Sequence, residues 1–104
     1  MSDVVDITLD TIIARLREIE PAIKAQGVTH LAVFGSRARG DARPGSDLDV
    51  LVDTTSRGES PPFDVFSVQH LIEDATGVPT QISMQEMLKP RMADRIVDDL
   101  VKIF

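Results

Sequence analysis

Apolar residues recur at helical spacing in three stretches of the chain. Between Thr8 and Gly27 they lie three or four residues apart, which predicts a helix with Thr8 as its N-cap and Gly27 at its end. Pro21 falls inside this pattern, so it kinks or divides the helix. The same spacing over 64–77 and over 89–104 predicts two further helices. The apolar side of the helix over 64–77 is expected to hold Val65, Phe66, Leu71, Ile72 and Ala75.

Shorter apolar runs between these helices predict strands. The runs over 28–34 and 47–53 are each bounded by polar or glycine residues, and residues 79–84 alternate between the two faces of a strand. The polar stretch 36–45 is expected to form a short helical turn followed by a loop, and 54–63 has the composition of a loop. This order of elements predicts an α/β (α+β) fold, in which helices pack on a three- or four-stranded mixed sheet.

Composition narrows the classes of function. The chain has 104 residues, a length expected to form one domain over 1–104. Its formal charge of -6 argues against extended nucleic-acid binding, although one nucleotide could still bind through local cations and metal ions. The chain has no Cys, no apolar run long enough for a membrane span and no basic, apolar leader at its start. We therefore expect a cytoplasmic protein without a membrane partner.

Two aspartates stand one residue apart at the start of the strand over 47–53. Side chains alternate along a strand, so Asp47 and Asp49 share a face, roughly 6–7 Å apart at the backbone. Two carboxylates at that separation can reach a pair of metal ions roughly 4 Å apart. Oxygen ligands without His or Cys nearby favour Mg²⁺, with Mn²⁺ as a substitute. Without a cation the two charges would repel, so the pair predicts a catalytic metal site.

A phosphate-binding pattern precedes these aspartates. Gly35 lets the backbone approach a ligand closely, and a short helix starting near Ser36 would direct free N–H groups at an anion. Arg37 and Arg39 are nearby cations that could meet a polyphosphate. A phosphate cradle beside a two-carboxylate metal site suggests a nucleoside triphosphate as substrate.

Each of these features has a simpler explanation when it is taken alone. A Gly-Ser step after a strand is commonly a turn, and an Asp-x-Asp is often a solvated strand end. Arginines in such a loop usually face solvent, as do the acidic residues near the end of the chain. His30 and His70 are more simply explained as structural residues than as catalytic ones. The combination of features is much more specific than any one of them.

The stretch "FGSRARGDARPGSDLDVLV", from Phe34 to Val52, carries Gly-Ser, then ten residues, then Asp-x-Asp. It resembles the signature of the DNA-polymerase-β-like nucleotidyltransferase superfamily, and more closely its small members, the minimal nucleotidyltransferases (MNT). The resemblance implies a minimal nucleotidyltransferase fold, magnesium on Asp47 and Asp49, and the triphosphate on Gly35 and Ser36. Such proteins often act as antitoxins beside a helical HEPN ribonuclease toxin, to which they transfer AMP from ATP.

The chain departs from the family pattern at one position. Family members carry a third carboxylate on the next strand, where Gln81 stands here. Gln is neutral and cannot act as a general base, although its carbonyl oxygen can still approach a metal or a water. Asp53 lies four residues past Asp49, roughly 13 Å along the strand, which is too far for it to complete the same cluster.

Three functions are therefore weighed. The first is an adenylyltransferase that modifies a HEPN-type protein partner and so acts as its antitoxin. The second is a catalytically weakened or inactive relative that neutralises its partner by binding alone. The third is nucleotidyl transfer to a small hydroxyl substrate, for which a chain of this length leaves little room. A partner is expected to contact exposed apolar positions of the terminal helices, and homo-oligomerisation is left open.

Overall fold

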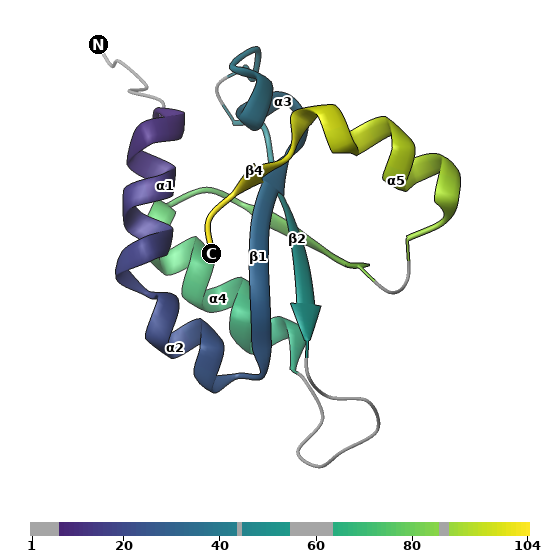
Figure 1. The fold of residues 1–104 in the computed structure, drawn as a ribbon. Helices are drawn as coiled ribbons and strands as arrows, with labels where there is room; N and C mark the ends of the chain where they lie inside the picture. Colours follow the sequence, from purple (N-terminus) through teal and green to yellow (C-terminus); the bar gives the residue numbers. More distant parts are fainter. Residues whose placement is uncertain (1–6, 44, 55–63, 86–87) are drawn as a thin grey trace, which may run out of the picture.

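Four strands form one mixed sheet in the part of the chain that the computed structural model describes, residues 7–43, 45–54, 64–85 and 88–104. The strand order is β3-β2-β1-β4 (Figure 1). Strand β1 (Val28–Phe34) is antiparallel to β2 (Leu48–Thr54), and β2 is parallel to β3 (Thr80–Met84). Strand β4 (Val101–Lys102) is antiparallel to β1 at the sheet edge. The prediction of a small mixed sheet with helices packed on it is confirmed.

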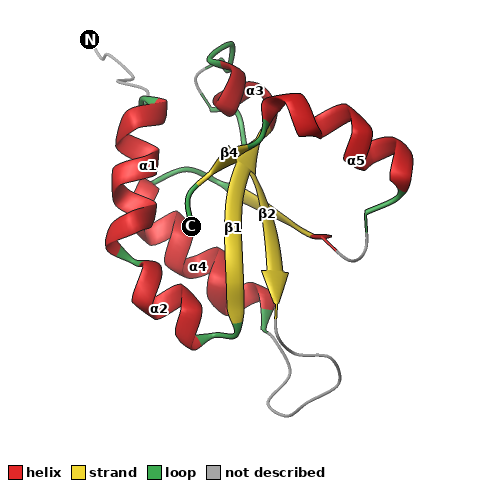
Figure 2. Ribbon diagram, in the orientation of Figure 1, coloured by secondary structure: helices red, strands yellow, loops and turns green. Residues whose placement is uncertain are grey.

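Three helices cover one face of this sheet (Figure 2). They are α1 (Leu9–Glu18), α2 (Glu20–Ala25) and α4 (Val65–Thr76). Their apolar sides and the inward side chains of the strands form the main core, where most aliphatic side chains are fully removed from water. The largest of these are Ile12, Leu16, Ile23, Leu31, Leu48 and Ile72.

The helix ends follow the local sequence. The Thr8 side chain accepts a hydrogen bond from the Thr11 amide at 3.2 Å, which confirms it as the N-cap of α1. Pro21 stands in the first turn of α2, where its missing N–H costs nothing, so the predicted helix divides in two. Gly77 ends α4 with a φ of 73°, a conformation that glycine adopts at little cost.

Helix α4 presents a different side to the core than the sequence predicted. Val68, Ile72 and Thr76 are its buried residues. Phe66 was expected among the core positions, but its side chain is 69% exposed. Residues 68, 72 and 76 are each about one helical turn apart, and Phe66 lies about 120° around the helix from Ile72 when counted at 3.6 residues per turn. The expected apolar side therefore included a residue that faces solvent.

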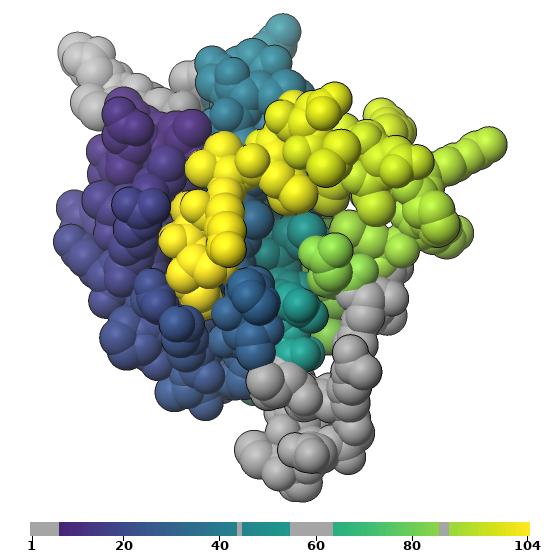
Figure 3. Space-filling view, in the orientation of Figure 1, coloured from purple at the N-terminus to yellow at the C-terminus, as the bar shows by residue number. Residues whose placement is uncertain are grey.

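The opposite face of the sheet is only partly covered. Helix α5 (Pro90–Ile96) packs Ile96 against Phe34 and Leu51 there, and Leu88 joins this smaller cluster. In Figure 3 the C-terminal segment, drawn in yellow, runs across the front of the molecule between α5 and the N-terminal helices. The rest of this face, along β1 and β2, carries polar and apolar side chains with no helix over them in the described residues.

The prediction of a helix over 89–104 is wrong at its C-terminal end. Helix α5 ends at Ile96, a 3-10 turn η2 (Val97–Asp99) follows, and the chain then becomes β4. Two hydrogen bonds join Leu31 to this segment. The Leu31 amide donates to the Phe104 carbonyl at 3.0 Å, and the Leu31 carbonyl accepts from the Ile103 amide at 2.8 Å. Pairing with the open edge of β1 therefore overrides the helical spacing of the sequence.

Two remaining expectations concern loops and spans. The short helical turn is confirmed as α3 (Gly35–Arg39). The predicted loop over 54–63 lies outside the described residues except for Thr54, which ends β2. Among the described residues, no helix has the length and apolar character needed to cross a membrane.

Candidate active site

The end of β1 and the start of β2 meet at one end of the sheet. Phe34, the last residue of β1, pairs with Asp49 of β2, and α3 begins directly after it. Helix α3 and the loop that follows it connect the two strands, and this connection brings Gly35 beside Asp49 of β2. One predicted phosphate-binding residue, Gly35, and one predicted metal ligand, Asp49, are therefore neighbours in space.

Gly35 is in direct contact with Asp49. Its φ of 78° lies in the left-handed region, which a residue with a side chain rarely adopts. A Cβ atom at this position would overlap Oδ2 of Asp49 and lie 3.3 Å from its Cγ. Glycine is therefore required here twice, once for the turn and once for the space that the carboxylate occupies.

Gln81 lies beside both aspartates. It is paired with Asp49 in the parallel register of β2 and β3, so the two side chains leave the sheet on the same face. Its Nε2 donates a hydrogen bond to Oδ2 of Asp47 at 3.0 Å. The structure thus brings Asp47, Asp49 and Gln81 together.

The surroundings of Asp49 disfavour its charged form. The pKa of Asp49 is raised, mainly because its carboxylate is partly removed from water and further because Asp47 is also negative. Arg39 acts in the opposite direction and favours the charged form of Asp49. A cation placed between the aspartates would relieve this repulsion, which is the electrostatic condition of a metal site.

The donor set fits a hard divalent ion that is shared with a substrate. Two carboxylates and an amide oxygen are ligands suited to Mg²⁺ or Mn²⁺. Within the described residues, no group of three or more His, Cys, Asp or Glu side chains could hold a metal ion. Mg²⁺ is commonly held by one or two carboxylates plus substrate phosphates, so a phosphorylated ligand would complete the coordination here.

Arg37 supports the loop that leads into β2. Its side chain is 5% exposed, and its Nε donates to the Ser46 carbonyl at 2.9 Å. This contact ties α3 to the segment just before Asp47. The sequence predicted that Arg37 faces solvent, because no local pattern indicates that its guanidinium is buried. Its predicted contact with a nucleotide stays a prediction.

Arg39 joins α3 to the C-terminal part of the chain. Its Nη1 donates to Oδ2 of Asp99 at 2.9 Å, and its Nε donates to Oδ2 of Asp41 at 3.2 Å. These bonds, that to Asp99 first, raise the pKa of Arg39, so it keeps its charge. Asp99 was expected on a solvated helix face, and the sequence carries no local signal of this pair because its residues are 60 positions apart.

Asp53 lies at the other end of β2. It pairs in register with His30, and its Oδ2 is 3.8 Å from Nδ1 of that residue. Both side chains are at least half exposed. Asp53 is therefore separate from the cluster of Asp47, Asp49 and Gln81, as its position four residues along the strand predicts.

Comparisons with known proteins identify the family of the chain. The nucleotidyltransferase domain family matches residues 9–103. The protein adenylyltransferase MntA of Thermococcus cleftensis is 31% identical over 97 residues, which cover 85% of this chain and 95% of that one. A solved structure assigned as a minimal nucleotidyltransferase has a TM-score of 0.76 and 30% identity, and covers 93% of this chain and 97% of its own.

A more distant likeness concerns the fold alone. The structure of a tri-AMPylated Shewanella oneidensis HEPN toxin in complex with MNT antitoxin matches with a TM-score of 0.62 at 9% identity. The match covers 89% of this chain and 71% of that one. Together with the family match, these findings show that the chain belongs to the nucleotidyltransferase domain family, as one of its minimal members.

Proposed function

We propose that this protein binds Mg²⁺-ATP and transfers AMP to a hydroxyl group of a HEPN-type partner, and thereby acts as its antitoxin. One observation carries the proposal: Gly35 lies directly against Asp49, and Asp47 is close by, so the predicted phosphate-binding turn and the two predicted metal ligands lie at one place. The name of the Thermococcus cleftensis relative supports transfer to a protein. The Shewanella oneidensis complex supports a HEPN toxin as the acceptor.

The residues of the chain have separate parts in this reaction. The backbone at Gly35 and the hydroxyl of Ser36 bind the β- and γ-phosphates, and Arg39 adds positive charge at the same side. Asp47 and Asp49 would hold a divalent ion, which supplies charge neutralisation at the phosphates when bound. Arg37 keeps the loop before Asp47 in place through its bond to Ser46.

The transfer forms one bond and breaks one. The acceptor oxygen bonds to the α-phosphorus of ATP, the bond from that phosphorus to the bridging oxygen breaks, and pyrophosphate leaves. Gln81 cannot accept the proton of the acceptor hydroxyl, so this proton passes to water. General-base help is commonly worth about 10²–10⁴-fold in rate, so we expect slow transfer.

The hydrogen bond from Gln81 to Asp47 favours a second candidate function. An amide that donates to a metal-binding carboxylate lowers the negative charge available to a second ion. A protein of this kind would retain ATP binding but neutralise its partner mainly by forming a complex with it. The two candidates share the nucleotide site and differ only in whether AMP is found on the partner.

Titration calorimetry tests the nucleotide site directly. Asp47→Asn combined with Asp49→Asn should abolish Mg²⁺-dependent ATP binding, because both predicted metal ligands lose their charge. Asp94→Asn combined with Asp98→Asn removes the same charge from exposed positions near the C-terminus and should leave binding unchanged. Equal ATP affinity in wild type and in the Asp47/Asp49 variant would contradict the proposal.

Mass spectrometry of a co-expressed HEPN-type partner separates the two candidates. A mass increase of one AMP on a tyrosine of the partner supports transfer. A stable complex without that increase, formed by a protein that binds ATP, supports neutralisation by binding alone.

A further inference from the structure

Arg39 lies on the side of α3 that faces the aspartates. It is the last residue of this helix, four positions after Gly35, so the two residues lie one turn apart on the same side. Gly35 in turn lies against Asp49. The charge of Arg39 acts to lower the pKa of Asp49, so the guanidinium is within electrostatic reach of that carboxylate. Arg39 is therefore a cation of the candidate active site itself.

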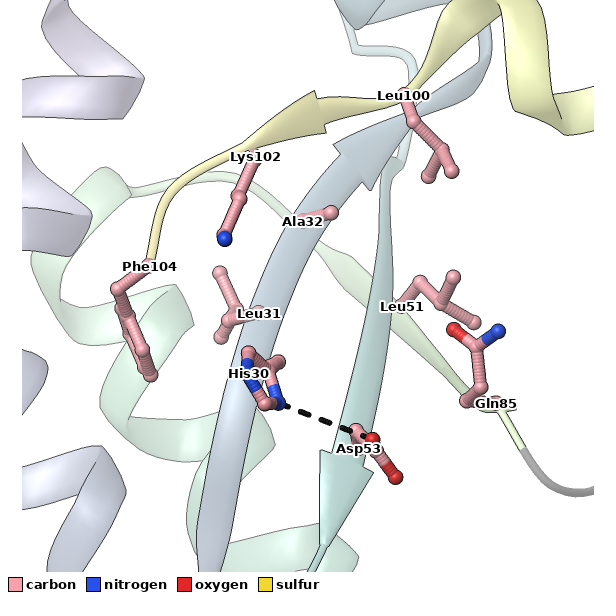
Figure 4. A pocket seen from close by; sticks show the side chains of 9 residues that line it. All are labelled: His30, Leu31, Ala32, Leu51, Asp53, Gln85, Leu100, Lys102 and Phe104. Carbon is pink, nitrogen blue, oxygen red and sulfur yellow. Dashed lines mark ion pairs between the residues drawn. The ribbon is translucent and has the colours of Figure 1, made fainter.

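Asp99 approaches Arg39 from a distant part of the chain. It ends the 3-10 turn η2, and the next residue, Leu100, lies where the C-terminal segment passes the end of β1 (Figure 4). Helix α3 starts at this same end of β1. On one side of η2, Ile96 is buried against Phe34, and on the other side β4 pairs with β1. The backbone that carries Asp99 is therefore held on both sides, which gives its carboxylate a fixed place beside α3.

Two carboxylates hold the guanidinium of Arg39 by different nitrogens. Asp99 accepts from Nη1 at 2.9 Å, and Asp41 accepts from Nε at 3.2 Å. The third nitrogen, Nη2, makes no hydrogen bond or ion pair within the described residues. A guanidinium has five N–H donors, so these two bonds leave others for a further acceptor. The side chain is 46% exposed, so a ligand can reach them.

We infer that Asp99 is a positioning residue for nucleotide binding, because it holds Arg39 in the orientation in which its remaining N–H groups meet the phosphates of ATP. The inference rests on the proposed function and extends it to a residue outside the predicted site. An unrestrained arginine side chain samples many rotamers, and ordering it on binding reduces affinity. Asp99 lowers this cost, since it restricts the side chain before the nucleotide arrives.

Charge alone predicts the opposite effect of Asp99 on nucleotide binding. Asp99 is an anion near the place proposed for the phosphates, so its removal would strengthen ATP binding if only Coulomb repulsion mattered. Stability offers no substitute explanation, because the side chains of Arg39 and Asp99 are 46% and 22% exposed and such ion pairs contribute little to it. A loss of ATP affinity without Asp99 would therefore report the positioning of Arg39.

Titration calorimetry with Mg²⁺-ATP and the full chain tests the inference. Asp99→Ala should weaken ATP binding about 3–10-fold, the effect that fixing one long side chain in advance commonly has. Asp99→Glu can still pair with Arg39 and should stay within about twofold of wild type. Asp98→Ala removes the same charge from the neighbouring, exposed position, and should also stay within about twofold.

Arg39→Gln makes the assignment specific. It removes the guanidinium itself and should weaken ATP binding at least about tenfold. Because Asp99 acts through Arg39, adding Asp99→Ala to Arg39→Gln should cause no further loss. AMP lacks the β- and γ-phosphates, so Asp99→Ala should leave AMP affinity unchanged. The melting temperature of Asp99→Ala without nucleotide should stay close to that of wild type, which also shows that the variant folds.

Several results would overturn the inference. Tighter ATP binding by Asp99→Ala would show that Asp99 competes with the phosphates for Arg39. Equal losses of ATP and AMP affinity, together with a lower melting temperature, would show a purely structural role. Unchanged ATP affinity in Asp99→Ala would overturn the inference alone, provided that Asp47→Asn with Asp49→Asn abolishes binding. A wild type that binds no Mg²⁺-ATP would contradict the proposed function and the inference together.

Discussion

Strand β2 carries aspartates near both of its ends, on one face of the sheet, and their surroundings differ. Asp49 is half-buried, contacts Gly35 and lies near the charge of Asp47. Asp53 is half exposed and faces His30 across the strand pair. The same residue type thus stands once where its charge is costly and once where water solvates it. Charges that are costly to keep cluster at ligand sites, whereas a solvated charge needs no special explanation.

Gly35→Ala should disturb the surroundings of Asp49 and cause the largest loss of nucleotide affinity among these variants. The added Cβ would overlap Oδ2 of Asp49, so either the carboxylate or the turn must move. We expect Mg²⁺-ATP affinity measured by calorimetry to fall at least about 100-fold, because a displacement near 1 Å in such a site is commonly this damaging.

Gly40→Ala is the matched control for this change. Its φ of 84° imposes the same left-handed strain, about 1–2 kcal/mol, but a Cβ there meets no atom within 4 Å. Both variants should lose stability, and only Gly35→Ala should lose nucleotide binding. Equal ATP affinity in the two variants would show that contact with Asp49 does not matter.

Gln81→Asp should increase the rate of AMP transfer at the Asp49 end of β2. It restores a negative charge beside Asp47 and Asp49, together with a group that can accept the proton of the acceptor. We expect AMP incorporation into the purified partner at saturating Mg²⁺-ATP to rise by up to about 100-fold. Gln26→Asp adds the same charge at the end of α2 and should leave the rate unchanged. Fast transfer by the wild type with no gain in Gln81→Asp would place the proton acceptor elsewhere.

Asp64 lies outside β2 and allows a comparison with a carboxylate that has a structural role. It caps α4 by accepting hydrogen bonds from the Phe66 amide at 3.0 Å and from the Ser67 hydroxyl at 2.8 Å. Asp64→Ala should lower the melting temperature by about 4–8 °C at pH 7, with no change in ATP affinity. An unchanged melting temperature would show that this cap contributes little.

The same cap predicts a dependence on pH. The hydrogen bonds, that of Ser67 first, lower the pKa of Asp64 in the folded state below its usual 3.8. Its stabilisation is therefore complete above that value and is lost as the pH falls through the lower, folded-state pKa. Asp64→Asn keeps a capping oxygen without a charge, so the difference in melting temperature between it and wild type should shrink at low pH.

The smallest effect concerns stability at the two ends of β2. Asp49→Asn removes a partly desolvated charge that Asp47 repels, so we expect the melting temperature without Mg²⁺ to rise by about 1–4 °C. Asp53→Asn removes a solvated charge and should leave it nearly unchanged. A larger rise for Asp53→Asn would reverse the comparison between the two ends.

The sequence predicted the features that short-range patterns control. Pro21 divided the first helix because a proline has one favourable place near a helix start. Strand alternation predicted Asp47 and Asp49 on one face because the side-chain period of a strand is fixed, and Gln81 indeed contacts Asp47 and pairs with Asp49. The Gly-Ser step and the aspartates lie close in the chain, so their meeting needed only one tight connection.

Features that depend on distant contacts could not be predicted in the same way. The apolar positions from Met92 to Phe104 fit a helix, yet the end of the chain pairs with β1, since an open strand edge supplies hydrogen bonds to a short alternating segment. The ion pair of Arg39 and Asp99 has no local signal for the same reason. The burial of Arg37 depends on how the loop after α3 folds back onto it.

Strand β4 also determines when the sheet can be completed during folding. Leu31 exchanges hydrogen bonds with Ile103 and Phe104, about 70 residues later in the chain, so this edge of the sheet closes only after those later residues have been synthesised. Contacts of such long range slow folding, because the chain loses conformational entropy in closing the intervening loop before the contacts stabilise it. Until then β1 has an unpaired edge in the nascent protein, which a chaperone or a neighbouring strand could occupy.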